Sequence, residues 1–132
     1  QLFRMAEIYG KEGRSSYIRA RFTFDLIWPL VYGFFLVTSL SWLTGKLFGQ
    51  DSRWNQVNLL PLAGVLFDYL ENISTSIVML RYPEEIWLAA NLASIFTMGK
   101  WISLGMSFAI LANFLFQALF RGLKKAVRSE RI

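Results

Sequence analysis

Four polar side chains at helical spacing stand in the stretch LFDYLENISTS at residues 66–76, inside the long apolar run of residues 59–80. They are Asp68, Glu71, Asn72 and Thr75. Their spacing of i, i+3, i+4 and i+7 puts all four on one face of a helix. Two carboxylates on such a face can act as acid and base, hold a divalent metal ion or pair with a cation. The face is expected to point into protein, because a charge in the middle of a bilayer costs about 2.5–3.5 kcal/mol.

Lys100 is the cation expected to meet this face. The segment RYPEE at residues 81–85 contains a proline and predicts a turn between two apolar helices. Asp68 lies 16 residues before Glu84 and Lys100 lies 16 residues after it, so both are about 24 Å along a helix from the turn. A hairpin would therefore bring them to the same depth. If Glu71 is also ionised the group sums to −1, so we expect one carboxyl group to hold or share a proton.

A second, smaller polar cluster is expected nearer the turn. Pro29 has no amide hydrogen, so the carbonyl of Asp25 four residues earlier loses its helical hydrogen bond. One helical turn therefore carries both a carboxylate and an unpaired carbonyl group. We expect Asp25 to pair with Arg81, with Asn91 nearby, and so to close that end of the bundle.

The elements that must position these groups are three long apolar runs at residues 22–45, 59–80 and 86–120. The first has 24 residues, or about 36 Å of helix, enough to cross a hydrocarbon core of about 30 Å. The third is either one long helix or a short helix that ends near Gly99 and Lys100 and is followed by another span. The predicted fold is all-α: a transmembrane helical bundle with three long spanning helices, or four.

The amino-acid composition indicates that the folded chain is surrounded by an apolar solvent such as a lipid bilayer. Of 132 residues, 55% are hydrophobic and 17% aromatic, more than a soluble domain of this size carries. The chain has no Cys and no His, which excludes thiol nucleophiles, disulfides, zinc fingers, Ser-His-Asp triads and His-ligated haem. We expect no cofactor. The net charge of +5 comes from basic residues at the edges of the apolar runs, a pattern that favours anionic lipid headgroups over nucleic acid as partners.

The two ends of the chain are expected to lie outside the bilayer core, and the whole of 1–132 is expected to form a single membrane domain. Residues 1–21 predict either a short amphipathic helix on the membrane surface or a polar leader. Residues 121–132 form a basic tail, which we place in the cytoplasm because Lys and Arg are retained on that side. Three spans would then put the basic N-terminal segment outside. A fourth span, within 86–120 or before Gln1, would remove this conflict.

Small residues in the second and third apolar runs predict close helix packing and association into homo- or hetero-oligomers. They are Gly64, Ser103, Gly105, Ser107 and Ala109.

Three functions remain open. The polar cluster can fix the packing of an accessory or interaction subunit in a membrane assembly. It can instead serve a proton- or cation-coupled carrier or channel, or an intramembrane enzyme that modifies lipids. A cavity that opens beside the Asp68–Glu71–Lys100 cluster would favour the second and third functions, whereas tight packing would favour the first.

Overall fold

The computed structural model describes the backbone of residues 1–129 and the side chains of residues 1–124. In chain order it contains α1 (Leu2–Arg21), α2 (Phe24–Phe48), the 3-10 helix η1 (Arg53–Asn58), α3 (Leu59–Arg81) and α4 (Trp87–Ser129). No strand occurs among the described residues, so the prediction of an all-α fold is confirmed. Of the basic tail expected at 121–132, the side chains of residues 125–132 lie outside the described part.

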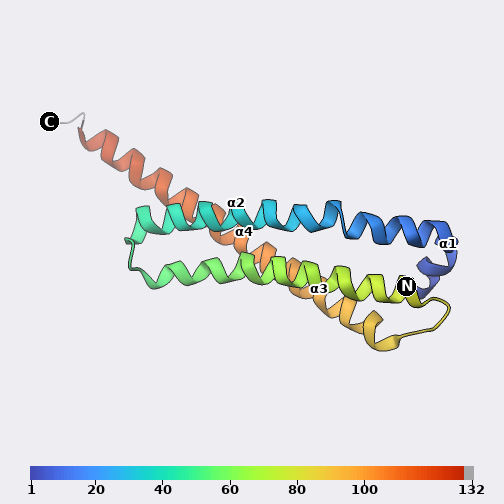
Figure 1. Cartoon of the computed structure of the whole chain (residues 1–132). Coiled ribbons are helices and arrows are strands. Elements are labelled where there is room, and N and C mark those ends of the chain that lie inside the picture. The colour runs from blue at the N-terminus through green and yellow to red at the C-terminus, as the bar shows by residue number, and fades with distance from the viewer. Residues whose placement is uncertain (130–132) are drawn as a thin grey trace.

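The helices form an elongated bundle (Figure 1). α2 and α4 run in broadly the same direction, α3 runs in the opposite direction, and α4 crosses the other two helices obliquely. α3 is the central helix, because it packs most extensively against α4 and also contacts α1 and α2. The α2–α3 loop lies at one end of the bundle, whereas α1 and the α3–α4 turn lie at the other.

Gly10 divides α1 into two arms. Its φ of 63° and ψ of −176° are not helical, and glycine adopts such a positive φ because it has no Cβ to clash. Arg14 bridges the kink by donating a hydrogen bond from Nη1 to the carbonyl of Ala6 at 2.9 Å. The first arm folds back, so that the rings of Phe3 and Trp87 meet edge to face with centroids 5.0 Å apart.

The chain leaves helical geometry only briefly between α1 and α2, at Phe22 and Thr23. Thr23 Oγ1 donates to the carbonyl of Arg19 at 2.8 Å, which satisfies one free carbonyl at the end of α1. As a result the arm of α1 that follows Gly10 and the helix α2 form an almost continuous rod (Figure 1). The predicted helices at 22–45 and 59–80 correspond to α2 and α3 with small shifts at their ends.

α4 is one continuous helix of 43 residues that passes through Gly99 and Lys100 without a break. A Cβ on Gly99 would lie 3.0 Å from ring carbons of Phe67 in α3, so the glycine allows this ring to pack directly on the α4 backbone. A glycine costs a helix only about 1 kcal/mol relative to alanine, and packing against α3 outweighs that cost. Of the two alternatives for residues 86–120, the long helix is the one that forms.

The apolar core lies toward the α2–α3 loop. Its buried members are Leu36, Leu40, Leu43 and Leu47 from α2 and Leu104, Leu111 and Phe114 from α4. The α2 residues recur every three or four positions, as a single helical face requires. This apolar contact holds α2 on α4, while the polar contacts described below lie toward α1.

Two segments of the described chain are long and apolar enough to cross a membrane, one within Leu2–Phe48 and one at Trp87–Lys124. The first contains α2 and the second is the described part of α4. α3 is not among them, so the three or four spans expected are reduced to two that meet this test. The reason is the buried polar face of α3, which lowers its overall hydropathy even though protein covers it.

Candidate functional site: a buried polar network

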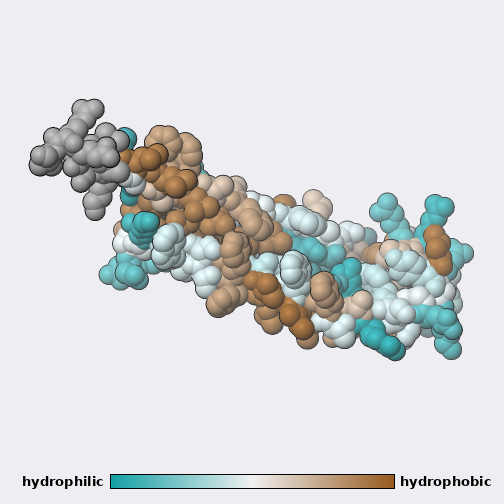
Figure 2. Space-filling view, turned by 90° about the horizontal axis from the view of Figure 1, so that it is seen from above, coloured by the Kyte–Doolittle hydropathy of each residue, from teal (hydrophilic) through white to brown (hydrophobic). Residues whose placement is uncertain are grey.

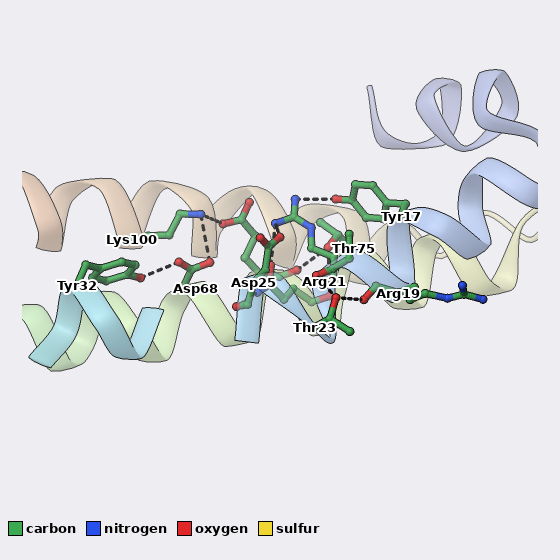
Figure 3. A network of polar contacts seen from close by, with 12 residues as sticks. Tyr17, Arg19, Arg21, Thr23, Asp25, Tyr32, Asp68, Thr75 and Lys100 are labelled. Atoms are coloured by element: carbon green, nitrogen blue, oxygen red, sulfur yellow. Dashed lines mark hydrogen bonds and ion pairs between the residues drawn. The ribbon is translucent and has the colours of Figure 1, made fainter. Parts of the chain in front are cut away.

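The polar face of α3 meets Lys100 of α4 (Figure 3). Lys100 Nζ lies 3.4 Å from Asp68 Oδ1 and 2.5 Å from Glu71 Oε2. The three side chains are only 11–13% exposed. Glu71 Oε2 is buried and accepts no hydrogen bond among the described residues, so its contact with the ammonium is an ion pair without hydrogen-bond geometry. The hairpin count from Glu84 thus places Asp68 and Lys100 together, as the structure does.

Tyr32 of α2 completes the surroundings of Asp68. Its hydroxyl donates to Asp68 Oδ2 at 2.6 Å, while Lys100 donates to the other carboxylate oxygen. The phenol and the ammonium therefore converge on Asp68 from α2 and α4 (Figure 3). Hydrogen bonds to an ionised carboxylate are roughly twice as strong as those between neutral groups.

Arg21, at the end of α1, is the second cation of the site. Its Nη1 donates to Asp25 Oδ2 at 2.8 Å and to Asn72 Oδ1 at 2.9 Å. Its Nη2 donates to the Tyr17 hydroxyl at 2.8 Å. One guanidinium thus joins α1, α2 and α3, which its rigid fork of donors is well suited to do.

Asn72 repairs the gap that Pro29 leaves in α2. Its Nδ2 donates to the carbonyl of Asp25 at 3.3 Å, the group that lacks a helical donor because Pro29 has no amide hydrogen. The Tyr69 hydroxyl donates to the next carbonyl, that of Leu26, at 2.7 Å. The unpaired carbonyl predicted from the sequence therefore receives its donor from α3.

Thr75 contributes least to these contacts between helices. Its hydroxyl donates to the carbonyls of Glu71 and Asn72 in its own helix, at 2.9 and 3.2 Å. Such a bond back to the helix satisfies the hydroxyl locally. Below, "the polar network" means Arg21, Lys100 and the side chains that ion pairs or side-chain hydrogen bonds join to them, directly or through Asp68: Tyr17, Asp25, Tyr32, Asp68, Glu71 and Asn72.

The expected pairing of Asp25 with Arg81 does not form. Asp25 pairs with Arg21, four residues earlier in the same rod, whereas Arg81 lies 3.7 Å from Glu84 on the exposed α3–α4 turn. Asn91 lines a separate cavity between α1 and α4. α3 extends past the start of α2 and packs there on α1, so Arg81 is carried beyond the reach of Asp25.

Of the five small residues predicted to allow close helix packing, some lie inside the bundle and others lie on its surface. A Cβ on Gly64 would lie 2.9 Å from Leu104 Cδ2, and Ser103 and Ser107 are buried. Gly105 and Ala109 are exposed, and a Cβ on Gly105 would meet no atom within 4 Å. The close approach expected from Gly105 and Ala109 is therefore absent within the described chain.

The polar network borders a cavity of about 360 Å³ between α2 and α4, termed here the α2–α4 cavity, which opens partly to the surroundings. It is lined by Arg21, Asp25, Trp28, Pro29, Tyr32, Asp68, Lys100, Trp101, Leu104 and Phe108. A second cavity of about 760 Å³ lies between α1, α3 and α4 and reaches Arg21, Glu71 and Thr75. The network is thus packed within the bundle but is not closed off on either side.

Arg21, Tyr17 and Tyr32 were not expected as members of the site. Arg21 stands four residues before Asp25, which is ion-pair spacing on a helix, but it lies just outside the apolar run that begins at residue 22. Tyr32 carries no sequence signal of its own, because its meeting with Asp68 depends on how the α2–α3 loop sets the register.

No group of three or more Asp, Glu, His or Cys side chains placed to hold a metal ion occurs in the described residues. Comparison of the chain with protein-family models, with curated proteins and with solved structures finds no match. The polar network and the surfaces around it therefore carry the functional argument.

Proposed function

We propose that the chain is an integral membrane protein that serves as a non-catalytic accessory or interaction subunit of a membrane assembly. The observation that carries this proposal is an inverted distribution of polarity. Large apolar side chains of α2 and α4 are exposed, among them Phe34 at 74%, Leu88 at 71% and Trp101 at 66%. Counted as whole residues, backbone included, Asp68 and Glu71 of α3 are each only 8% exposed. Exposed apolar side chains around buried charged ones are unfavourable in water and favourable in a lipid bilayer.

The surface view supports the same proposal. In Figure 2, apolar residues gather along the part of the molecule built by α2 and α4, and hydrophilic residues gather at the end that holds α1 and the α3–α4 turn. A band of this kind next to a polar end is what a bilayer and its headgroup region would require.

α3 is proposed as a third membrane crossing. α2 and α4 run in the same direction, and the chain can cross twice in one direction only if it returns between the crossings. α3 makes that return, and its carboxylates are shielded by Lys100, Arg21 and Tyr32. In this role the network would set the register of the three helices, the best-supported use of buried polar groups.

A surface for a partner helix is offered by α4. Gly105 and Ala109 are four residues apart and exposed, the spacing that lets a second transmembrane helix approach closely. We place the end of α4 in the cytoplasm because Arg121 and Lys124 lie near that end. Arg121 also donates to the carbonyl of Leu47 at 2.8 Å, so the α2–α3 loop belongs on the same side.

The proposal is tested with the tagged full chain expressed in a bacterial membrane. We expect it to stay in the pellet after alkaline carbonate extraction and to migrate as a stoichiometric complex after gentle solubilisation. Gly105→Leu combined with Ala109→Leu should dissociate the complex, while Gly122→Leu, at another open position of α4, should not. Release into the carbonate supernatant would refute membrane integration, and a monomer without partner under all conditions would refute the subunit role.

A proton- or cation-coupled carrier is the second candidate, and the α2–α4 cavity beside Asp25 and Asp68 favours it. Such a carrier would predict flux that depends on pH and is lost in Glu71→Gln. Reconstituted chain that moves no cation across vesicles at any pH would end this candidate. The lipid-modifying enzyme has no comparable support, because Asp68 and Glu71 are both engaged by Lys100.

A further inference from the structure

The α2–α4 cavity combines charged groups with aromatic rings. At its polar side stand Asp25 and Asp68, and rings of Trp28 and Trp101 line it as well. Lys100 Nζ lies 5.8 Å from the centroid of the Trp101 ring. Indole faces attract cations through their quadrupole, so the lining offers two kinds of attraction for a positive group.

The charges of the polar network do not cancel. Three carboxylates (Asp25, Asp68 and Glu71) face two cations, Arg21 and Lys100, which leaves a formal charge of −1 when all five are ionised. No other Lys or Arg side chain of residues 1–124 lies within ion-pair distance of these carboxylates. The α2–α4 cavity is lined by Asp25, Asp68 and both cations, while Glu71 lines the other cavity. Lys100 lies closer to Glu71, at 2.5 Å, than to Asp68, at 3.4 Å, so its charge is shared and compensates Asp68 only in part. A buried carboxylate that is compensated in part is unfavourable, and a cation bound beside it would relieve this. An anion in the same cavity would be repelled by Asp68, since Lys100 is shared with Glu71.

A second hollow lies between α2 and α4 beyond the charged end. This hollow of about 440 Å³, one helical turn further along both helices, is lined by residues that include Phe35, Trp42, Leu43, Leu111 and Leu115. Its lining is almost entirely apolar, with Thr38 and Ser39 as the exceptions. Together, the α2–α4 cavity with its charged groups and the apolar hollow next to it match a molecule with a charged head and a hydrocarbon body.

We propose that the α2–α4 cavity binds a lipophilic organic cation, with its ammonium-type head at Asp25 and Asp68 between Trp28 and Trp101 and its hydrocarbon part along α2 and α4. This inference goes beyond the accessory role, and its binding test gives an answer whether or not a partner subunit is found. The competing occupant is an amphiphilic anion, such as an alkyl phosphate, held by Arg21 and Lys100.

The experiment uses the full chain in nanodiscs of zwitterionic lipid. Radiolabelled tetraphenylphosphonium is the probe, and empty nanodiscs give the background of partitioning. We expect saturable binding in excess of that background. Dodecyltrimethylammonium should displace the probe, whereas dodecyl phosphate and dodecyl maltoside, with the same chain length, should not.

Matched variants locate the site. Trp28→Leu keeps an apolar side chain at a position that is 55% exposed, so it should fold, and we expect about threefold to tenfold weaker binding from loss of the ring face. Asp68→Asn should weaken binding about tenfold or more. Asp51→Asn, in the exposed α2–α3 loop, and Trp87→Leu, which lines the other cavity, should leave binding unchanged.

Three results would overturn the proposal. The first is the absence of saturable binding, and the second is displacement by dodecyl phosphate as effective as displacement by the cation. The third is binding that depends on Trp87 and not on Trp28, since this would place the probe in the cavity between α1, α3 and α4. Should Asp68→Asn fail to fold, the comparison of Trp28→Leu with Trp87→Leu still decides.

Discussion

At the scale of single residues, a few charged side chains hold the helices together through their contacts with one another. Lys100 contacts two carboxylates, and Arg21 contacts a carboxylate, an amide and a phenol. Each cation therefore ties its own helix to a neighbour: Lys100 joins α4 to α3, and Arg21 joins α1 to α2 and α3. Loss of one partner leaves the others buried and unpaired, which costs more than the pair itself contributes.

We expect Lys100→Met to lower the free energy of unfolding by about 3–5 kcal/mol, because Asp68 and Glu71 would remain buried without their cation. Thermal unfolding in detergent, followed by circular dichroism, measures the change. Adding Glu71→Gln should recover part of the loss, since it removes one of the two unpaired charges.

Lys46→Met is the matched control. Lys46 is exposed and lies over the Trp42 ring at 4.7 Å, so this variant should unfold close to the native temperature. Equal behaviour of the two lysine variants would show that the Lys100 ion pairs do not stabilise the fold.

At the scale of elements, α3 supplies hydrogen-bond donors to backbone carbonyls of α2. α2 has a proline within its second turn, and the side chains of Asn72 and Tyr69 donate to the carbonyls at that point. α2 in turn approaches α3 closely at Gly33, where a Cβ would lie only 2.6 Å from Val65 Cγ2. The helices α2 and α3 are therefore joined both by these hydrogen bonds and by close packing.

The repair of α2 predicts a coupling between Pro29 and Asn72. Pro29→Ala restores an amide hydrogen that can bond to the carbonyl of Asp25. Asn72→Ala should therefore be less destabilising in the Pro29→Ala background than in the native one, by about 0.5–1.5 kcal/mol. A double-mutant cycle of unfolding free energies measures this difference, and strict additivity would contradict the assigned hydrogen bond.

Two glycine substitutions should have opposite effects. Gly33→Ala places a methyl group against Val65, whose branched side chain is restricted in a helix and cannot turn away; we expect a loss of about 1–3 kcal/mol. Gly105→Ala meets open space and should gain up to about 1 kcal/mol from helix propensity. Unfolding in detergent measures both, and stabilisation by both would contradict the close packing of α2 on α3.

At the scale of the whole molecule, the direction of the helices decides the topology. With α2 and α4 parallel and α3 antiparallel to them, the α2–α3 loop and the α3–α4 turn lie at opposite ends of the bundle. If the bundle crosses the bilayer as proposed, these two connections face opposite sides. The two basic ends of the chain are then separated in the same way.

The chain has no cysteine, so single introduced cysteines can be labelled without background. In intact cells an impermeant maleimide should label Glu84→Cys, in the α3–α4 turn, from outside. Ser52→Cys, in the α2–α3 loop, should react only after the cells are opened. Labelling of both positions from one side would exclude α3 as a crossing, and labelling with reversed sides would place the end of α4 outside.

The all-helical fold could be predicted from the sequence because helix formation and apolar periodicity are local properties. The Asp68–Lys100 contact could also be predicted, since a short turn at residues 81–85 leaves one hairpin register. The same kind of count fails for the α2–α3 connection. If α2 and α3 formed a hairpin centred on the middle of residues 49–58, Tyr32 would lie opposite Thr75. That position is two helical turns from Asp68, the residue that Tyr32 contacts in the structure.

Sequence alone therefore determined the helices, their polar face and the pairing across the tight turn. Tertiary structure decided that Tyr32 meets Asp68, that Arg21 replaces Arg81 as the partner of Asp25, and that a cavity opens between α2 and α4. The physical reason is the range of the forces involved. Short connections fix register by chain geometry, whereas an irregular loop with its own 3-10 helix lets side-chain packing and ion pairing select the register from several that the chain permits.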